Sequence, residues 1–118
     1  MEQSGSPSFT SNVRDFGAIG DGEVMDTDAI QRSIDGVFRE GGGVVYFPPG
    51  DYLTGTVELR DNVTLYLEAG ATIWGSKSRK DYTQGCLIYA EGAANAAIRG
   101  RGAIDGNGKS FWKNGLTD

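Results

Sequence analysis

The spacing of apolar residues changes once along this chain, from a helical period to alternation. Residues 27 to 39 place apolar side chains on one helix face, at Ala29, Ile30, Ile34, Val37 and Phe38. Asp26, Thr27 and Asp28 can accept the free N–H groups at a helix start, and the glycines at 41 to 43 end the pattern. The spacing therefore predicts one amphipathic helix over roughly residues 27 to 39.

The segment before this helix has no helical period. Residues 1–12 are polar, so we expect a flexible lead-in there and a folded domain over residues 13–118. A short strand is expected around Val13 and Phe16, followed by tight turns at the glycines of positions 17, 20 and 22.

The chain after Gly43 is a train of short apolar runs. Residues 44–47 are β-branched and aromatic, and they stop at Pro48, Pro49 and Gly50, which mark a turn. Further runs follow, each bounded by Gly, Asp or Asn, and no second helical pattern separates them. This pattern predicts successive short strands without intervening helices.

A weak internal repeat relates two of these stretches. Its offset drifts from 33 to 31 residues through the pairs Asn62 with Asn95, Leu65 with Ile98, Gly70 with Gly102, Ile73 with Ile104, and Gly75 with Gly106. Such a repeat is typical of a solenoid, in which residues 77–85 form a loop pushed out of one turn. A β-sandwich also has short strands. The repeat, and a leading helix able to cover the first coil, favour an all-β fold of the parallel β-helix type.

Composition excludes several function classes. The chain has 118 residues, enough for one domain, and a net charge of −5, so it has no overall attraction for nucleic acid or an anionic membrane. No apolar run is long enough to span a membrane and no secretory signal is recognisable, so we expect a cytoplasmic protein, or a secreted one whose signal was removed. Without histidine, and with Cys86 as the single cysteine, we predict no metal site and no cofactor.

Five segments resemble the amino-terminal portion of glycoside hydrolase family 28, the polygalacturonases of the pectate-lyase-like superfamily. They are FGAIGDG, DTDAIQ, GGGVVYFPPGDYLTGTVEL, NVTLYLEAGATIWGS and LIYAEGAANAAIRGRGAIDGNGKSFW. The last segment is closer to polygalacturonases, whereas the first three occur across many β-helix families. The resemblance implies a right-handed single-stranded parallel β-helix with an N-terminal α-helical cap. It also implies inverting hydrolysis of α-1,4-galacturonan, the polyanion of pectin.

The catalytic signature of that family is absent from this sequence. The family carries NTD, DD, GHG and RIK motifs on later coils, and this chain contains none of them. We therefore expect the N-terminal part of a longer enzyme, a truncated solenoid that is inactive alone and has no catalytic residue. Terminal coils of a solenoid need polar caps, so the uncapped last coil is expected to invite self-association.

Basic residues are the candidate substrate contacts, because Arg and Lys bind the carboxylates of a polyuronate. Lys77, Arg79 and Lys80 cluster in the inserted loop, although a solvated loop explains them equally well. Arg99 and Arg101 are expected to alternate on one strand face. The predicted substrate-binding set is Arg79, Lys80, Arg99 and Arg101. Sugar-stacking aromatics are also possible among Tyr82, Phe111 and Trp112.

The remaining candidates have ordinary structural explanations that we favour. Asp105 precedes a glycine and is expected to hydrogen-bond its own turn. Charge on solvent-facing strand positions accounts for Glu58, Glu68 and Glu91, although these carboxylates could also act as acid and base or bind Ca²⁺. The glycine-rich stretches lack the setting of a nucleotide-binding loop. Cys86 is expected to be a buried, inert thiol.

Two other functions fit the same pattern. One is a non-catalytic carbohydrate-binding or trimerising module, similar to part of a phage tailspike. The other is a polysaccharide lyase, in which Ca²⁺ and a basic residue serve to remove a proton.

Overall fold

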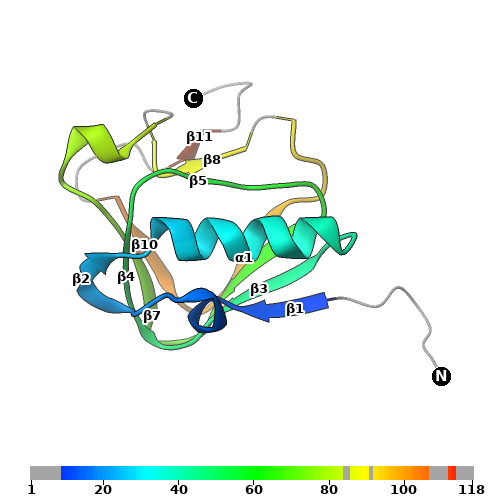
Figure 1. Ribbon diagram of the computed structural model, residues 1–118, viewed down its shortest axis with the longest axis horizontal. Coiled ribbons are helices and arrows are strands. Elements are labelled where there is room, and N and C mark those ends of the chain that lie inside the picture. The colour runs from blue at the N-terminus through cyan, green and yellow to red at the C-terminus, as the bar shows by residue number, and fades with distance from the viewer. Residues whose placement is uncertain (1–8, 84–85, 91, 107–111, 114–118) are drawn as a thin grey trace.

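Three parallel β-sheets, wound from successive turns of one chain, form the body of the molecule (Figure 1). The computed structural model describes residues 9–83, 86–90, 92–106 and 112–113. Two sheets have four strands and the third has three, and every pairing among them is parallel. The predicted parallel β-helix is confirmed.

Each turn of the spiral contributes one strand to two of the sheets, and each turn after the first also contributes one to the third. Sheet A contains β1 (Phe9–Asn12), β3 (Gly43–Phe47), β6 (Val63–Leu67) and β9 (Ala97–Gly100). Sheet B contains β2 (Asp21–Met25), β4 (Gly50–Thr54), β7 (Ala71–Gly75) and β10 (Ala103–Asp105). Sheet C contains β5 (Val57–Glu58), β8 (Ile88–Tyr89) and β11 (Trp112–Lys113). The helical elements are η1 (Val13–Phe16), α1 (Thr27–Arg39) and η2 (Arg79–Asp81).

The strand register confirms the repeat found in the sequence. Leu65 pairs with Ile98 in sheet A, and Ile73 pairs with Ile104 in sheet B. The turn before sheet A repeats as well, because Asn62 and Asn95 both adopt left-handed backbone angles, with φ of 62° and 61°. The Asn95 side-chain amide donates a hydrogen bond of 3.0 Å to the Asn62 side-chain oxygen. Asparagine tolerates this conformation better than most residues, which explains its recurrence.

Alternate residues of each strand point into a continuous apolar core. Leu65 of sheet A, Ile73 of sheet B and Ile88 of sheet C are all fully buried. The Phe47 and Tyr52 rings pack edge to face there, with centroids 5.3 Å apart. The intervening strand residues face outward, so every sheet has one surface available for other contacts.

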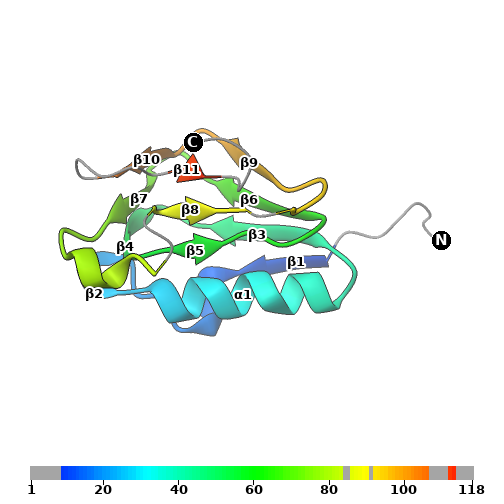
Figure 2. The same ribbon diagram turned by 90° about the horizontal axis from the view of Figure 1, so that it is seen from above.

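Helix α1 lies across the open end of the spiral (Figure 2). Ile30, Ile34 and Val37 are fully buried against the core, which confirms the helix predicted over residues 27–39. Gln31 holds the helix to sheet C, because its side-chain amide donates to the Glu58 carbonyl and accepts from the Glu58 N–H. In the part of the chain that the structure describes, no helix is long and apolar enough to cross a membrane.

Two expectations for the N-terminal segment differ from the structure. Residues 13–16 were expected to be extended but form η1, because the Asn12 side chain accepts from the Arg14 N–H and Gly17 ends the turn with φ of 104°. Residues 9–12 were expected in the flexible lead-in but pair with β3 as β1. Their sequence, FTSN, is too short and polar to show a strand pattern. Residues 1–8 lie outside the described residues.

Asp26 has a different function from the helix cap expected of it. It occupies the N-cap position of α1, but its side chain makes no capping hydrogen bond. Its two carboxylate oxygens instead accept from the Ile19 and Gly20 N–H groups, at 2.9 and 3.0 Å. This buried carboxylate therefore joins the helix start to the loop that leads into β2.

The core arrangement predicts that substitutions at two adjacent residues of β6 differ greatly in their effect on the free energy of unfolding. We expect Leu65→Ala to lower the free energy of unfolding by about 2 to 5 kcal/mol, because it leaves a cavity among all three sheets. Thr64→Ala is the matched control, and its outward position should limit the change to about 0.5 kcal/mol. Urea unfolding followed by circular dichroism measures both. Equal losses in the two variants would contradict this inward and outward assignment.

Candidate functional site

A groove of about 590 Å³ lies on the outer face of sheet B. Its volume falls within the range of roughly 300 to 1,000 Å³ that small-molecule sites occupy. Outward-facing residues of β2, β4 and β7 and the chain after β7 line it: Asp21, Gly22, Glu23, Asp51, Leu53, Trp74, Ser76 and Lys77. Sequence reasoning did not identify this groove, because its residues come from three different coils.

Trp74 forms the apolar part of the groove together with Leu53, which pairs with it in the β4–β7 register. The indole N–H donates a hydrogen bond of 3.0 Å to Asp51 Oδ1. This bond satisfies the single polar atom of the ring and restrains its orientation. A half-buried indole held in this way presents a firm apolar surface to the groove.

The polar residues of the groove are mainly acidic. Asp21, Glu23 and Asp51 contribute three carboxylates, whereas Lys77 contributes one ammonium group. Hydrogen bonds from the Glu23 and Val24 N–H groups to the Asp21 side chain lower the pKa of Asp21 below its ordinary value of 3.8. The groove is therefore electronegative at neutral and mildly acidic pH.

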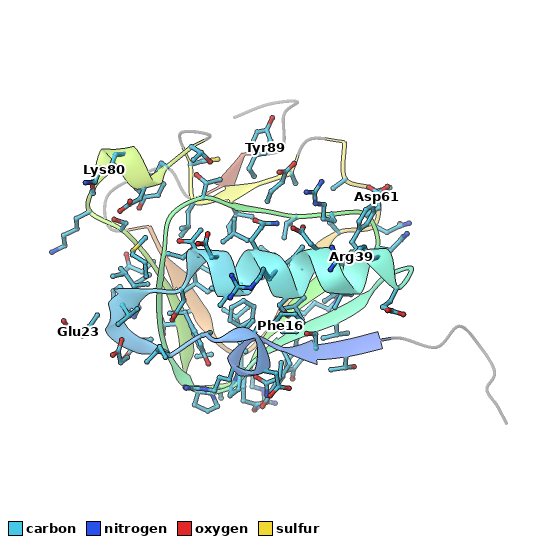
Figure 3. The ribbon with its side chains drawn as sticks, in the orientation of Figure 1. Phe16, Glu23, Arg39, Asp61, Lys80 and Tyr89 are labelled. Carbon is cyan, nitrogen blue, oxygen red and sulfur yellow. The ribbon has the colours of Figure 1, made fainter. Side chains whose placement is uncertain are left out.

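A smaller hollow of about 310 Å³ lies between the start of α1 and the segment around η2. Lys80 is exposed at its edge (Figure 3), and the other lining residues are Met25, Thr27, Asp28, Asp81 and Thr83. Asp28 and Asp81 bring two carboxylates beside the lysine, so the hollow is not strongly positive. Arg79, a predicted substrate contact, belongs to η2, but its side chain lies outside the described structure.

The loop that carries Lys80 is anchored to the β-helix. The Thr56 N–H donates to the Asp81 carbonyl at 3.1 Å, and the Ser76 hydroxyl donates to the Asp81 carboxylate at 2.5 Å. The Tyr82 hydroxyl donates to the Ser76 carbonyl, and burial, reinforced by the charge of Asp81, raises the pKa of Tyr82. Tyr82 therefore contributes to anchoring this loop.

The outer face of sheet A carries a column of aromatic and basic side chains. The Tyr46 and Tyr66 rings are stacked with centroids 6.2 Å apart, and Arg99 pairs with Tyr66 in the next strand. Tyr66 is 37% exposed and Arg99 is exposed. The Arg99 guanidinium group and the accessible Tyr66 ring therefore belong to paired residues on the same surface.

The expected alternation of Arg99 and Arg101 is not observed. Strand β9 ends at Gly100, whose φ of 107° interrupts the extended chain, and Arg101 lies beyond it with its N–H bound to the Leu67 carbonyl. The structure also separates the basic candidates. Lys77 and Lys80 follow sheet B, whereas Arg99 lies on sheet A, so they do not form one anion-binding site.

The acidic candidates do not converge either. Glu58 lies in sheet C, whereas Glu68 follows β6 in sheet A and accepts a hydrogen bond from Tyr46 at 3.3 Å. Asp105 is exposed at the end of β10, paired with Trp74. Among the described residues, no group of three or more His, Cys, Asp or Glu side chains is placed to hold a metal ion.

The remaining predicted residues are a buried cysteine and three aromatic or acidic residues whose side chains lie outside the described structure. Cys86 is buried and its thiol donates to the Ile88 carbonyl at 3.4 Å. Trp112 contributes backbone to β11, and its side chain lies outside the described structure. Glu91 and Phe111 also lie outside the described residues.

Comparison with known proteins identifies the family of this chain. Residues 10–114 match the family model described as rhamnogalacturonase A/epimerase, pectate lyase-like. The chain belongs to this pectate-lyase-like family. The resemblance to glycoside hydrolase family 28 is also confirmed, because polygalacturonases are among the relatives of this pectate-lyase-like chain in both sequence and structure.

Three proteins that are similar to this chain show how much of it aligns with known enzymes. Exo-poly-α-D-galacturonosidase of Dickeya chrysanthemi is 33% identical over 123 residues, which cover 86% of this chain and 20% of that protein. Alginate lyase 7 of Azotobacter vinelandii is 43% identical over 65 residues, covering 55% of this chain and 8% of that protein. The exopolygalacturonase structure from Thermotoga maritima has a TM-score of 0.80 at 29% identity, covering 90% of this chain and 27% of that one. The chain therefore spans less than a third of each of these pectate-lyase-like proteins.

The hydrogen bonds of Asp21 predict an acid-range dependence of stability. A carboxylate with a lowered folded pKa stabilises the fold above its unfolded pKa, and that contribution is lost as the pH falls through the folded value. We expect an NMR titration of the Asp21 side-chain carboxyl carbon to give a midpoint below 3.8 in the folded protein. The same titration in concentrated urea is the control and should return the ordinary value. Coinciding midpoints would show that the two backbone hydrogen bonds do not favour the ionised form.

Proposed function

We propose that this chain forms the N-terminal cap and first coils of a polygalacturonase-like hydrolase that cleaves the α-1,4-galacturonan of pectin with inversion. The observation that carries the proposal is the match of residues 10–114 to the family model, together with polygalacturonase relatives aligned over most of the chain. The chain spans 20% and 26% of the length of two such relatives. The greater part of a related enzyme is therefore built from coils beyond the aligned region.

In this proposal the catalytic carboxylates belong to those other coils. Inverting hydrolysis needs a carboxylic acid and a carboxylate about 6.5 to 9.5 Å apart, with a water molecule between the carboxylate and the sugar. Of the carboxylates that the sequence offered among the described residues, Asp105 ends β10 of sheet B, whereas Glu58 lies in sheet C and Glu68 follows β6 of sheet A. We infer that the isolated chain does not cleave galacturonan.

Arg99 is the best supported of the proposed substrate contacts. A guanidinium group can bind a carboxylate through two parallel hydrogen bonds, and the neighbouring Tyr66 ring offers a surface for the sugar. Lys80 and Arg101 are exposed as well, but two carboxylates surround the hollow of Lys80 and Arg101 lies outside the strand. Arg79 is retained as a proposed contact on its sequence position alone.

A second candidate is a polyuronate lyase or epimerase. The similarity to alginate lyase 7 over 65 residues, at 43% identity, supports this reading. A lyase and a hydrolase of polyuronates share an anionic sugar chain as substrate, so the Arg99 contact fits both. They differ in the product, because a lyase leaves an unsaturated uronate and a hydrolase does not. Self-association through the last coil stays a prediction, since residues 107–111 and 114–118 lie outside the described residues.

The first test compares this chain with the longer protein that the proposal requires. Polygalacturonate incubated with the isolated chain should release no reducing ends, whereas the longer protein should release saturated products. Ultraviolet absorbance of an unsaturated product would favour the lyase instead. Turnover by the isolated chain would overturn the proposal that its catalytic carboxylates lie elsewhere.

The second test addresses Arg99. We expect Arg99→Gln to weaken the binding of trigalacturonate by about two- to fivefold, the range for an exposed ion pair, with a smaller loss for Arg99→Lys. Arg39→Gln removes the same charge from the last turn of α1 and should leave binding unchanged. Isothermal titration calorimetry at low ionic strength measures all four proteins. Identical affinities for Arg99→Gln and Arg39→Gln would exclude a specific contact at Arg99.

A further inference from the structure

The groove on sheet B has a chemistry opposite to the one that a polyuronate requires. Three carboxylates and one ammonium group line it, so an anionic sugar chain is repelled there. Carboxylates only accept hydrogen bonds when ionised, and Asp21 stays ionised in mild acid because of its lowered pKa. The matching ligand groups are therefore uncharged donors such as hydroxyls.

The apolar part of the groove restricts the ligand further. Trp74 lies beside Leu53, and the bond from its indole N–H to Asp51 leaves the ring without an unsatisfied donor. A flat surface of this kind packs against the C–H face of a pyranose ring. Carboxylate acceptors beside an indole and a leucine thus suit a molecule with an apolar face and hydroxyl donors around it.

We propose that the outer face of sheet B binds an uncharged sugar chain, with one pyranose ring packed on Trp74. Its hydroxyls donate to Asp21, Glu23 and Asp51, and Lys77 donates to a ring or hydroxyl oxygen. This site is separate from Arg99 on sheet A, and it does not depend on the hydrolase proposal.

Nuclear magnetic resonance of the 118-residue chain tests the site directly. The probes are β-1,4-galactotetraose, cellotetraose and xylotetraose, with tetragalacturonate as the charged comparison. We expect at least one neutral probe to shift the Trp74 indole N–H signal and the Ser76 and Lys77 amides, while tetragalacturonate leaves them unchanged. The second indole, that of Trp112, distinguishes a local effect from a general one. No shift by any neutral probe up to about 10 mM, well beyond a millimolar dissociation constant, would overturn the proposal.

Three aromatic substitutions locate the contact. Trp74→Ala should weaken binding of the neutral probe by about tenfold, the equivalent of one good aromatic contact. Phe38→Ala is the matched control, because it removes an exposed ring from α1, which has no part in the proposed site. Trp74→Phe keeps a ring and should retain most of the affinity, so it tests the proposal even if Trp74→Ala folds poorly. Unchanged affinity in a folded Trp74→Ala protein would exclude the stacking contact.

Reversing the charge of Glu23 tests whether the groove carboxylates exclude an anionic sugar. Glu23 is exposed (Figure 3), and Glu23→Lys should let tetragalacturonate shift the groove signals and should weaken binding of the neutral probe, because the substitution replaces a hydroxyl acceptor by a cation. Glu40→Lys makes the same charge change at the end of α1 and should have neither effect. Binding of tetragalacturonate to the unaltered groove, or no gain in Glu23→Lys, would overturn the assignment to an uncharged sugar. Turnover of polygalacturonate is measured separately, so loss of either proposal leaves the other testable.

Discussion

In-register stacking of coils is the constraint on which the rest of this structure depends. Each strand obtains its hydrogen bonds from the coils beside it, and the same register brings apolar residues together in the core, as with Leu65 and Ile98. Because side chains alternate along a strand, a slip of one residue would turn the inward set outward. The outer surfaces are fixed by the same register. The stacking of Tyr46 on Tyr66 and the pairing of Leu53 with Trp74 are consequences of it.

The first coil presents a different physical problem, because no earlier coil among the described residues covers it. Helix α1 covers it with Ile30, Ile34 and Val37, and polar contacts around the apolar stripe hold the helix in place. Gln31 binds the main chain of β5, and the buried hydroxyls of Ser11 and Ser33 share a hydrogen bond of 2.9 Å. The apolar stripe supplies the burial, whereas these directional bonds fix the position of the helix.

The outward faces of the β-helix differ in charge and chemistry. Sheet A carries stacked tyrosines and a guanidinium group, whereas sheet B carries an indole among carboxylates. These differences arise at positions that do not affect the core, so they are free to vary while the coils remain stacked. A pectate-lyase-like fold can therefore carry chemically different surfaces without any change in its architecture.

Local pattern was sufficient to predict most of the fold. The helix at 27–39 and the repeat through Leu65 and Ile73 follow from periodicity, because a helix face and an inward strand position recur at fixed spacings. Strand β1 and the turn η1 lacked such a signal. In β1 the strand is set by pairing with β3, and in η1 by an asparagine cap and a following glycine.

The sites depended on tertiary structure for a definite reason. Asp51 and Trp74 are 23 residues apart, and their hydrogen bond exists because the coil returns to the same sheet after 21 residues, which places Trp74 beside Leu53 and diagonal to Asp51. Coil lengths vary, from 20 residues between Val45 and Leu65 to 34 between Ser11 and Val45, so outward neighbours cannot be assigned from a local pattern. Sequence alone therefore determined which residues face the core, because the pattern of hydrophobic positions is sufficient to identify them. Only the three-dimensional winding decided which outward residues meet, since the loop lengths set that arrangement.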